Sequence, residues 1–198
     1  PTQTAEELNT AWNEFGAKYT YHEYKDTYNR GGKATIQRIR DRNHSWGDDG
    51  LASLVPLAMA QGILGYPYIC PDMIGGGEWK YTVDANFVCD EELFVRMAQC
   101  SALFPMMQFS WAPWRMLSKE YLGYCLDAAK LHKKFLPYLT EKIKESAISG
   151  EPIVRHMEYQ FPNEGFEKID DQFALGERII VAPVIEKGAV ERKVVLPK

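Results

Sequence analysis

The densest group of charged and polar side chains lies between Arg38 and Asp49, in the sequence RIRDRNHSWGDD. Glycoside hydrolysis needs a carboxylic acid that protonates the leaving oxygen and a second carboxylate across the sugar ring, about 5–5.5 Å away in retaining enzymes. Asp48 and Asp49 are adjacent, and their side chains diverge in an extended segment, so they cannot play both parts. One is then a candidate acid and the other a structural neighbour. Alternatively, Asp49 and Gly50 only cap the helix that follows, since exposed helical N–H groups favour Asp.

The composition is that of an ordinary globular protein. The 198 residues are 45% apolar and 25% charged, and 13% are aromatic. Aromatic side chains suit the apolar faces of sugar rings, but they serve equally well in a protein core. The net charge of −4 and the isoelectric point near 5.6 exclude nucleic acid as a partner, because such binding depends on Lys and Arg that neutralise phosphates.

The cysteines do not predict a metal site or a disulfide scaffold. Cys70, Cys89, Cys100 and Cys125 lack the spacing of zinc ligands and are too sparse for a disulfide-rich fold. We expect no metal and no organic cofactor. The longest apolar stretch, residues 51–64, is too short to span a bilayer, and the first residues do not resemble a signal peptide.

Helical and β-rich runs alternate along the chain, which is typical of βα units around a parallel sheet. The expected helices are Glu6–Phe15, Gly50–Ile63, Asp90–Phe104 and Leu117–Ser146. The expected strands or extended segments are Tyr19–Tyr28, Ile36–Trp46, Tyr66–Ile69 and Met106–Phe109. After Gly150 the sequence becomes rich in β-branched residues, with strands expected at Ile179–Val184 and Val190–Leu196, so a small β domain should begin around Gln172.

Four stretches, in order, resemble consecutive motifs of family 31 glycoside hydrolases. They are SWGDDG before a helix, then GYPYICPDMIGG, then FVRMAQCSALFPMMQ, and finally QFALGERIIVAPV at residues 172–184. The last is similar to the family segment QFxLGxxLLVAPV, which leads into a β domain. The resemblance covers almost the whole chain from about Tyr21, and it is the order of the motifs that carries it.

The resemblance implies roles for four residues. Asp48 corresponds to the general acid/base of the family motif Trp-x-Gly-Asp-Asn, and Trp46, displaced by one position from the family's aromatic residue, would form a wall of the pocket. Arg30 falls where the family has a substrate-contacting Arg, although Gly31 replaces the usual Ser. Asp72 falls on the Asp of the Asp-Ile-Gly-Gly loop, which in the family lies beside the sugar of the first subsite.

Two departures from the family pattern bear on function. The family's nucleophile is an Asp upstream of the matched region, and nothing between residues 1 and 29 resembles its motif, so we expect it outside this chain. Many α-glucosidases of the family have a sugar-contacting His where this chain reads QFSW at 108–111, which argues against glucose. The loop form PDMIGG is similar instead to an animal branch of the family that includes a galactose-directed member.

Together these features predict an α/β fold: the C-terminal half of a (β/α)8 TIM barrel over residues 1–171, then the start of a β-sandwich domain over residues 172–198. The resemblance implies a retaining α-glycosidase that removes terminal galactose or glucose, with Asp48 as general acid/base. We expect the isolated chain to be inactive and to need the remainder of the catalytic domain or a companion chain. The alternative is a non-catalytic carbohydrate-binding or regulatory homologue. The animal-type likeness would place the protein in the secretory pathway or outside the cell.

Overall fold

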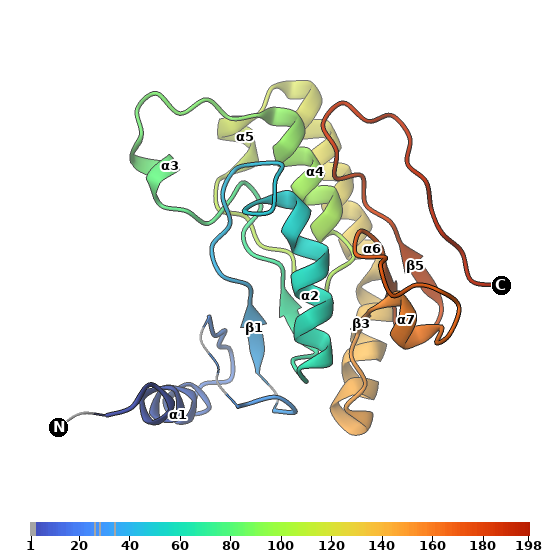
Figure 1. Ribbon diagram of the computed structural model, residues 1–198. Helices are drawn as coiled ribbons and strands as arrows, with labels where there is room; N and C mark the ends of the chain where they lie inside the picture. Colours follow the sequence, from blue (N-terminus) through green and yellow to red (C-terminus); the bar gives the residue numbers. More distant parts are fainter. Residues whose placement is uncertain (1–2, 26, 28, 34) are drawn as a thin grey trace.

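The computed structural model describes residues 3–25, 27, 29–33 and 35–198 (Figure 1). The helices in this part of the chain are α1 (Ala5–Gly16), the 3-10 turn η1 (Leu51–Ser53), α2 (Leu54–Ile63), α3 (Lys80–Val83), α4 (Glu91–Ser101), α5 (Pro113–Met116), α6 (Lys119–Ser149) and α7 (Met157–Gln160). The strands are β1 (Ile36–Arg38), β2 (Tyr68–Cys70), β3 (Val154–Arg155), β4 (Phe173–Leu175) and β5 (Ile179–Val181).

A parallel sheet forms the centre of the first part of the chain. Strands β1 and β2 pair in parallel, with Ile36 opposite Tyr68. Isolated parallel bridges extend this wall on either side, at Tyr24–Gln37 and Ile74–Phe109. Helix α2 returns the chain from β1 to β2, and α4 lies between the two bridged segments at 74 and 109. This alternation of parallel strands and covering helices is that of a βα wall.

The strands are shorter than the sequence predicts. Of the expected strand Tyr19–Tyr28, residues 26 and 28 lie outside the described residues, and the remainder contributes only the bridge at Tyr24. The segment expected to be extended over Ile36–Trp46 leaves the ladder after Arg38 and continues as a loop, and Met106–Phe109 is reduced to one bridge. A strand is defined by ladder hydrogen bonds to a neighbouring strand. These segments pair with their described neighbours only at isolated positions, so the strands are short.

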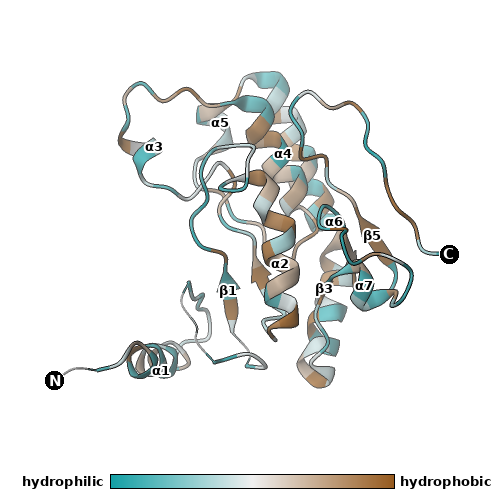
Figure 2. Cartoon of the chain, in the orientation of Figure 1, coloured by the Kyte–Doolittle hydropathy of each residue, from teal (hydrophilic) through white to brown (hydrophobic). Residues whose placement is uncertain are grey.

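Helix α2 is apolar around most of its circumference, as its largely brown colouring in Figure 2 shows. Leu54, Val55 and Met59 are buried on it, whereas Leu57 and Ile63 are exposed. At Gly62 a Cβ atom would lie 2.7 Å from the Val154 carbonyl oxygen, so only glycine lets α2 approach β3 this closely. The expected helix over residues 50–63 is confirmed as η1 followed by α2.

Helices α4 and α6 pack against each other across the core. Asp90 caps α4 by accepting a hydrogen bond of 3.1 Å from the Leu93 N–H, and Phe94 and Met97 lie buried on the inner face. Helix α6 ends at Gly150, whose φ of 77° is left-handed and favours glycine. Both helices were expected, and both are confirmed. Within the described residues no helix is both long and apolar enough to cross a membrane.

The C-terminal part of the chain forms an antiparallel sheet in the order β3, β4, β5. The expected strand at Ile179–Val184 is confirmed in its first half, as β5. The expected strand at Val190–Leu196 is wrong, since no ladder forms there among the described residues. The buried side chain of Gln172 bonds the Val195 backbone instead, to its carbonyl at 2.7 Å and from its N–H at 3.0 Å. The domain division at residue 172 stays a prediction.

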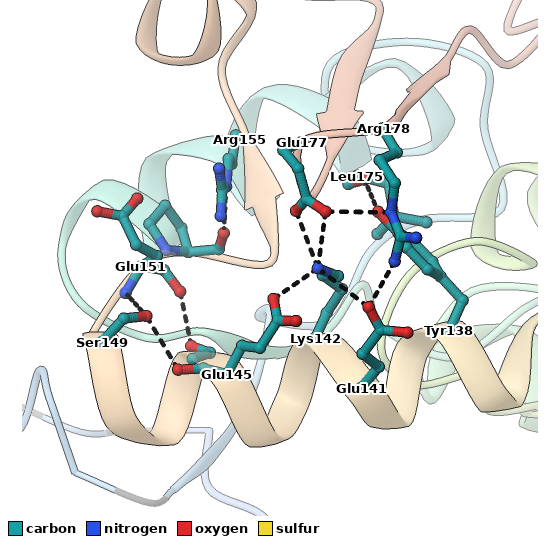
Figure 3. A network of polar contacts seen from close by, with 12 residues as sticks. Tyr138, Glu141, Lys142, Glu145, Ser149, Glu151, Arg155, Leu175, Glu177 and Arg178 are labelled. Atoms are coloured by element: carbon teal, nitrogen blue, oxygen red, sulfur yellow. Dashed lines mark hydrogen bonds and ion pairs between the residues drawn. The ribbon is translucent and has the colours of Figure 1, made fainter.

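A network of charged residues joins α6 to the β4–β5 hairpin (Figure 3). The buried Lys142 donates from Nζ to Glu177 at 2.9 Å and to Glu145 at 2.5 Å. Arg178 of the hairpin pairs with Glu141 of α6 beside it. These contacts attach the C-terminal sheet to the last long helix of the preceding part.

Candidate active site

Two carboxylates follow the carboxyl ends of the neighbouring parallel strands. Asp41 comes three residues after β1, and Asp72 comes two residues after β2. This edge of a parallel barrel is where catalytic groups are found. A methyl group added at Gly77 would lie 2.8 Å from an oxygen of each carboxylate, so the two side chains lie close together beside the glycine loop, which is formed by the three glycines at residues 75–77.

Arg38, the last residue of β1, joins these two carboxylates. Its Nη1 donates to Asp72 Oδ1 at 2.8 Å and lies 3.3 Å from Asp41 Oδ1, while its Nε lies 2.8 Å from a Glu23 oxygen. The Asp72 carboxylate is fully buried and also accepts the Arg42 N–H at 2.7 Å. Burial raises the pKa of Asp72, although the Arg42 N–H and the Arg38 guanidinium act in the opposite direction.

The backbone at Asp72 is unusual. Its φ of 85° lies in the left-handed region, which residues other than glycine seldom adopt. In this conformation the Asp72 carboxylate accepts hydrogen bonds from the Arg38 guanidinium and the Arg42 backbone N–H. The expected contact of Asp72 with a sugar therefore stays a prediction, and the geometry described here is that of a group holding two strand ends together.

The segment after β1 closes on itself as a compact loop. The Asn43 N–H donates to the Asp49 carbonyl at 2.7 Å, and the Leu51 N–H donates to the Ser45 carbonyl at 2.9 Å. The Asp49 carboxylate accepts hydrogen bonds from the side chains of Ser45 and Asn43, which lower its pKa. Asp49 thus stabilises the loop. The alternative that Asp49 and Gly50 cap the following helix holds for Gly50, which is the N-cap of η1, but not for Asp49, since no side chain caps η1.

Asp48 lies at the exposed tip of this loop. Among the described residues none donates a hydrogen bond to its carboxylate, which leaves it free to meet a ligand but not held in one orientation. It follows β1 by ten residues, whereas Asp41 follows by three. The assignment of Asp48 as the acid/base stays a prediction.

Trp46 and His44 of the same loop both bond Asp90, the N-cap of α4. Trp46 Nε1–H donates to Asp90 Oδ2 at 3.1 Å, and the Asp90 N–H donates to His44 Nε2 at 3.0 Å. His44 Nδ1 lies 2.9 Å from the Gly75 carbonyl oxygen. Burial lowers the pKa of His44, and a neutral ring with its proton on Nδ1 satisfies both contacts. The expected place of Trp46 in a pocket wall stays a prediction.

An aromatic cluster surrounds the His44 ring at the same end of the sheet. The ring centroids of Tyr81, Phe87 and Trp111 lie 6.3, 5.3 and 5.9 Å from that of His44. They come from the segments that follow β2 and the bridge at Phe109. Sequence reasoning did not group them, because they are far apart along the chain and their meeting depends on the parallel alignment of the sheet. Flat aromatic faces next to carboxylates suit a sugar ring.

Arg30 does not join this group. Its N–H donates to the Tyr66 hydroxyl at 3.1 Å, and the Gly32 N–H donates to the Gly65 carbonyl at 2.6 Å. Tyr66 and Gly65 precede β2, so Arg30 lies beside the amino end of that strand, opposite the end that Asp72 follows. A substrate contact of Arg30 at the same site stays a prediction that this arrangement does not support.

Asp41 is a further candidate that the sequence motifs do not single out, because the motif beside Trp46 points to Asp48 and Asp49. The feature that makes Asp41 a candidate is its position, since it is the first carboxylate after a parallel strand. Its side chain is 30% exposed, and it pairs with Lys25 at 2.5 Å. It is therefore both anchored and accessible.

The chemistry available at this end of the sheet is that of carboxylates and aromatic faces, which fits proton transfer to a sugar oxygen. Within the part of the chain that the structure describes, no three His, Cys, Asp or Glu residues gather in a way that could hold a metal ion.

Comparison with protein families decides the relationship. The family model for the "Glycosyl hydrolases family 31 TIM-barrel domain" matches residues 27–142. The model for the "Glycosyl hydrolase family 31 C-terminal domain" matches residues 150–198. The chain belongs to glycosyl hydrolase family 31. The fold predicted from the sequence, part of a TIM barrel followed by the beginning of a C-terminal β domain, is that of family 31.

Similar proteins agree with this assignment. The myogenesis-regulating glycosidase of Mus musculus is 39% identical over 166 residues, 81% of this chain and 23% of the relative. The SITS-binding protein of Tetronarce californica is 33% identical, over 81% of this chain and 22% of the relative. The structure of a family 31 sulfoquinovosidase from E. rectale shares the fold, with a TM-score of 0.72 and 23% identity over 83% of this chain and 25% of that one. The chain spans less than a quarter of the two curated relatives.

Proposed function

We propose that the complete polypeptide containing this chain hydrolyses terminal α-linked galactose or glucose with retention, and that this chain supplies the general acid/base. The observation that carries the proposal is the accessible carboxylate of Asp41, three residues after β1 and beside the buried Arg38–Asp72 pair, in a family 31 barrel. A carboxylic acid at that position protonates the leaving oxygen and then deprotonates water.

Two carboxylates of the loop after β1 are candidates for this role. Asp48 is the candidate of the sequence pattern, through the motif SWGDDG. Asp41 is the candidate that the geometry supports best, because it comes three residues after the strand and is held by Lys25 and Arg38. An acid/base must be fixed within a few tenths of an ångström of its working position, and anchoring provides this.

The nucleophile belongs, in this proposal, to the remainder of the catalytic domain. A retaining mechanism needs a second carboxylate about 5–5.5 Å from the first. Asp72 is not that group, because its carboxylate is fully buried against Arg38. We assign Asp72, with Trp46 and the cluster around His44, to shaping the sugar pocket from this side. The remainder of the barrel, on the same polypeptide or a companion chain, supplies the opposite side.

The stereochemistry of the first product tests this function. The complete polypeptide is incubated with aryl α-galactoside and aryl α-glucoside, and the anomer released is followed by proton NMR before mutarotation. We expect the α-anomer to appear first, and faster release from the galactoside, since QFSW replaces the His-bearing segment of many α-glucosidases. Release of the β-anomer would contradict retention, and a preference for glucoside would contradict the sugar assignment.

A second candidate is a protein that binds carbohydrate without turning it over. The 33% identical relative named SITS-binding protein favours a homologue without turnover, because that name describes binding of SITS and no reaction. Carbohydrate as the ligand of this chain is suggested by the family alone. Isothermal titration with galactose and with an α-galactoside separates the two candidates. Binding without any release of sugar over days would support the second candidate and contradict the first.

A further inference from the structure

A short segment of the C-terminal part, residues 186–189, lies on the first turns of α4. Three polar contacts hold it there, one from each of three neighbouring residues. They are Lys187 Nζ to Asp90 Oδ2 at 2.7 Å, the Gly188 N–H to Glu92 Oε1 at 2.8 Å, and Arg96 Nη2 to the Ala189 carbonyl at 2.9 Å. The segment is therefore bonded to the helix through its side chain and its backbone.

Asp90 connects this segment to the loop that carries the candidate acids. The same oxygen, Oδ2, receives Lys187 and the indole N–H of Trp46, while Oδ1 caps Leu93. The Asp90 N–H bonds His44. Two residues of the loop after β1, His44 and Trp46, thus both bond Asp90, the N-cap of α4. Lys187 of the C-terminal part bonds the side chain of the same residue.

Asp90 and Lys187 are both charged at neutral pH. Partial burial by itself would raise the pKa of Asp90, but the hydrogen bonds from Lys187, Trp46 and the Leu93 N–H outweigh it and lower that pKa to about 2. The hydrogen bond to Asp90 raises the pKa of Lys187. The carboxylate and the ammonium are therefore both ionised over the range in which glycosidases work.

We infer that Asp90, held in place by Lys187, is a positioning residue for the loop that carries the acid/base, so that the C-terminal part of the chain sets the geometry of proton transfer. This inference rests on the proposed function. Trp46 and His44 lie between Asp41 and Asp48, so their fixed contacts restrain the loop whichever carboxylate is the acid. A displacement of about 1 Å at a reacting group costs on the order of 100-fold in rate.

The first test separates the contact from general stability. Lys187→Met and Lys187→Arg are compared with Arg178→Met, which removes another exposed ion pair of the C-terminal part, to Glu141. Because an exposed pair shifts an equilibrium by up to about fivefold, we expect hydrogen exchange of residues 41–50 to rise about two- to fivefold in Lys187→Met only. The kcat for an α-glycoside should fall by a similar factor with KM within about twofold, and Lys187→Arg should restore both.

The second test removes the Asp90 side chain. Asp90→Ala loses the helix cap and the side-chain contacts with Trp46 and Lys187, while the backbone N–H that bonds His44 remains. Its control is Thr4→Ala, which loses the cap of α1 without touching the loop. We expect kcat to fall at least about tenfold in Asp90→Ala and to stay within about twofold in Thr4→Ala.

The outcomes distinguish this inference from the proposed function. If the unmodified protein turns over no glycoside, the proposed function fails, and loop exchange still tests whether Lys187 restrains the loop. Unchanged exchange in Lys187→Met and Asp90→Ala overturns the restraint. Raised exchange with unchanged kcat and KM overturns the positioning role while the proposed function stands.

Discussion

Arg38 and Asp72 form an ion pair of 2.8 Å between the ends of neighbouring parallel strands, with the carboxylate fully buried and the guanidinium largely so. The pair fixes the carboxyl end of β1 relative to that of β2, at the edge where Asp41 also lies. Removing one partner of a buried pair typically costs about 3–5 kcal/mol. Arg38 keeps its contacts with Glu23 and Asp41, so loss of Asp72 should cost an amount at the low end of that range. The strand ends, and the groups they carry, depend on this contact.

Asp72→Ala should lower the free energy of unfolding by about 3 kcal/mol, because Arg38 loses its buried partner and alanine is strained at the φ of 85°. Asp72→Asn should cost less, since asparagine tolerates the left-handed region and keeps hydrogen-bonding atoms. Asp49→Ala is the control, because it removes an exposed carboxylate from the loop after β1, and it should cost within about 1 kcal/mol. Urea unfolding of the complete polypeptide measures all three, and equal costs for Asp72→Ala and Asp49→Ala would contradict the buried pair.

Gly77→Ala should destabilise the protein by about 1–3 kcal/mol, because the added methyl group would lie 2.8 Å from oxygens of both Asp41 and Asp72. The matched control is Gly123→Ala in α6, where a Cβ meets no atom within 4 Å and alanine favours the helix. Gly123→Ala should raise the melting temperature and Gly77→Ala should lower it. Two changes of the same sign would argue against close packing of the glycine loop on the carboxylates.

Much of this arrangement could be predicted from the sequence. The order of the motifs indicated the family, and periodicity located α2, α4 and α6, because apolar faces and caps are local signals. Strand lengths could not be predicted, since pairing depends on neighbours remote in sequence. The Val190–Leu196 segment illustrates this: its β-branched residues favour a strand, but the Gln172 side chain takes the backbone bonds of Val195.

The candidate site could be predicted only in part, for a related reason. A motif directed attention to the loop after β1, but it could not rank the carboxylates of that loop as candidates. Ranking them requires knowing that β1 ends at Arg38 and that Asp41 lies beside Lys25. Arg30 shows the converse, because its place in the motif order was clear while its position at the other end of β2 depends on contacts with Tyr66.

Stability should fall as the pH is lowered below 4, in part through Asp90. Its pKa in the folded state is lowered from 3.8 to about 2, so its contribution is fully present above 3.8 and is lost as the pH falls toward 2. Asp90→Asn removes this titration. The variant should therefore lose stability less steeply between pH 4 and pH 2 than the unmodified protein, as measured by thermal unfolding. Parallel curves would show that Asp90 is not held ionised by Lys187 and Trp46.

Lys142→Ala should destabilise the protein by about 2–3 kcal/mol, because the side chain is only 4% exposed and both its buried stem and its bonds to Glu145 and Glu177 are lost. Lys142→Met keeps the stem and should cost about 1 kcal/mol less. Lys130→Ala, which removes an exposed ion pair with Asp127 on the same helix, should cost within about 0.5 kcal/mol. Chemical unfolding checks the order, and a cost for Lys142→Ala no larger than that for Lys130→Ala would contradict the network of Figure 3.

The most direct test of the central claim compares Asp41→Asn with Asp48→Asn in the complete polypeptide, on a natural α-galactoside and on one with an activated phenol as leaving group. The true acid/base variant should lose about 10²–10⁴-fold in kcat/KM on the natural substrate and much less on the activated one, which needs no proton. We predict this signature for Asp41→Asn, and a loss below about tenfold for Asp48→Asn. The reverse pattern would restore Asp48 as the acid, and equal losses on both substrates in both variants would contradict an acid/base in this chain.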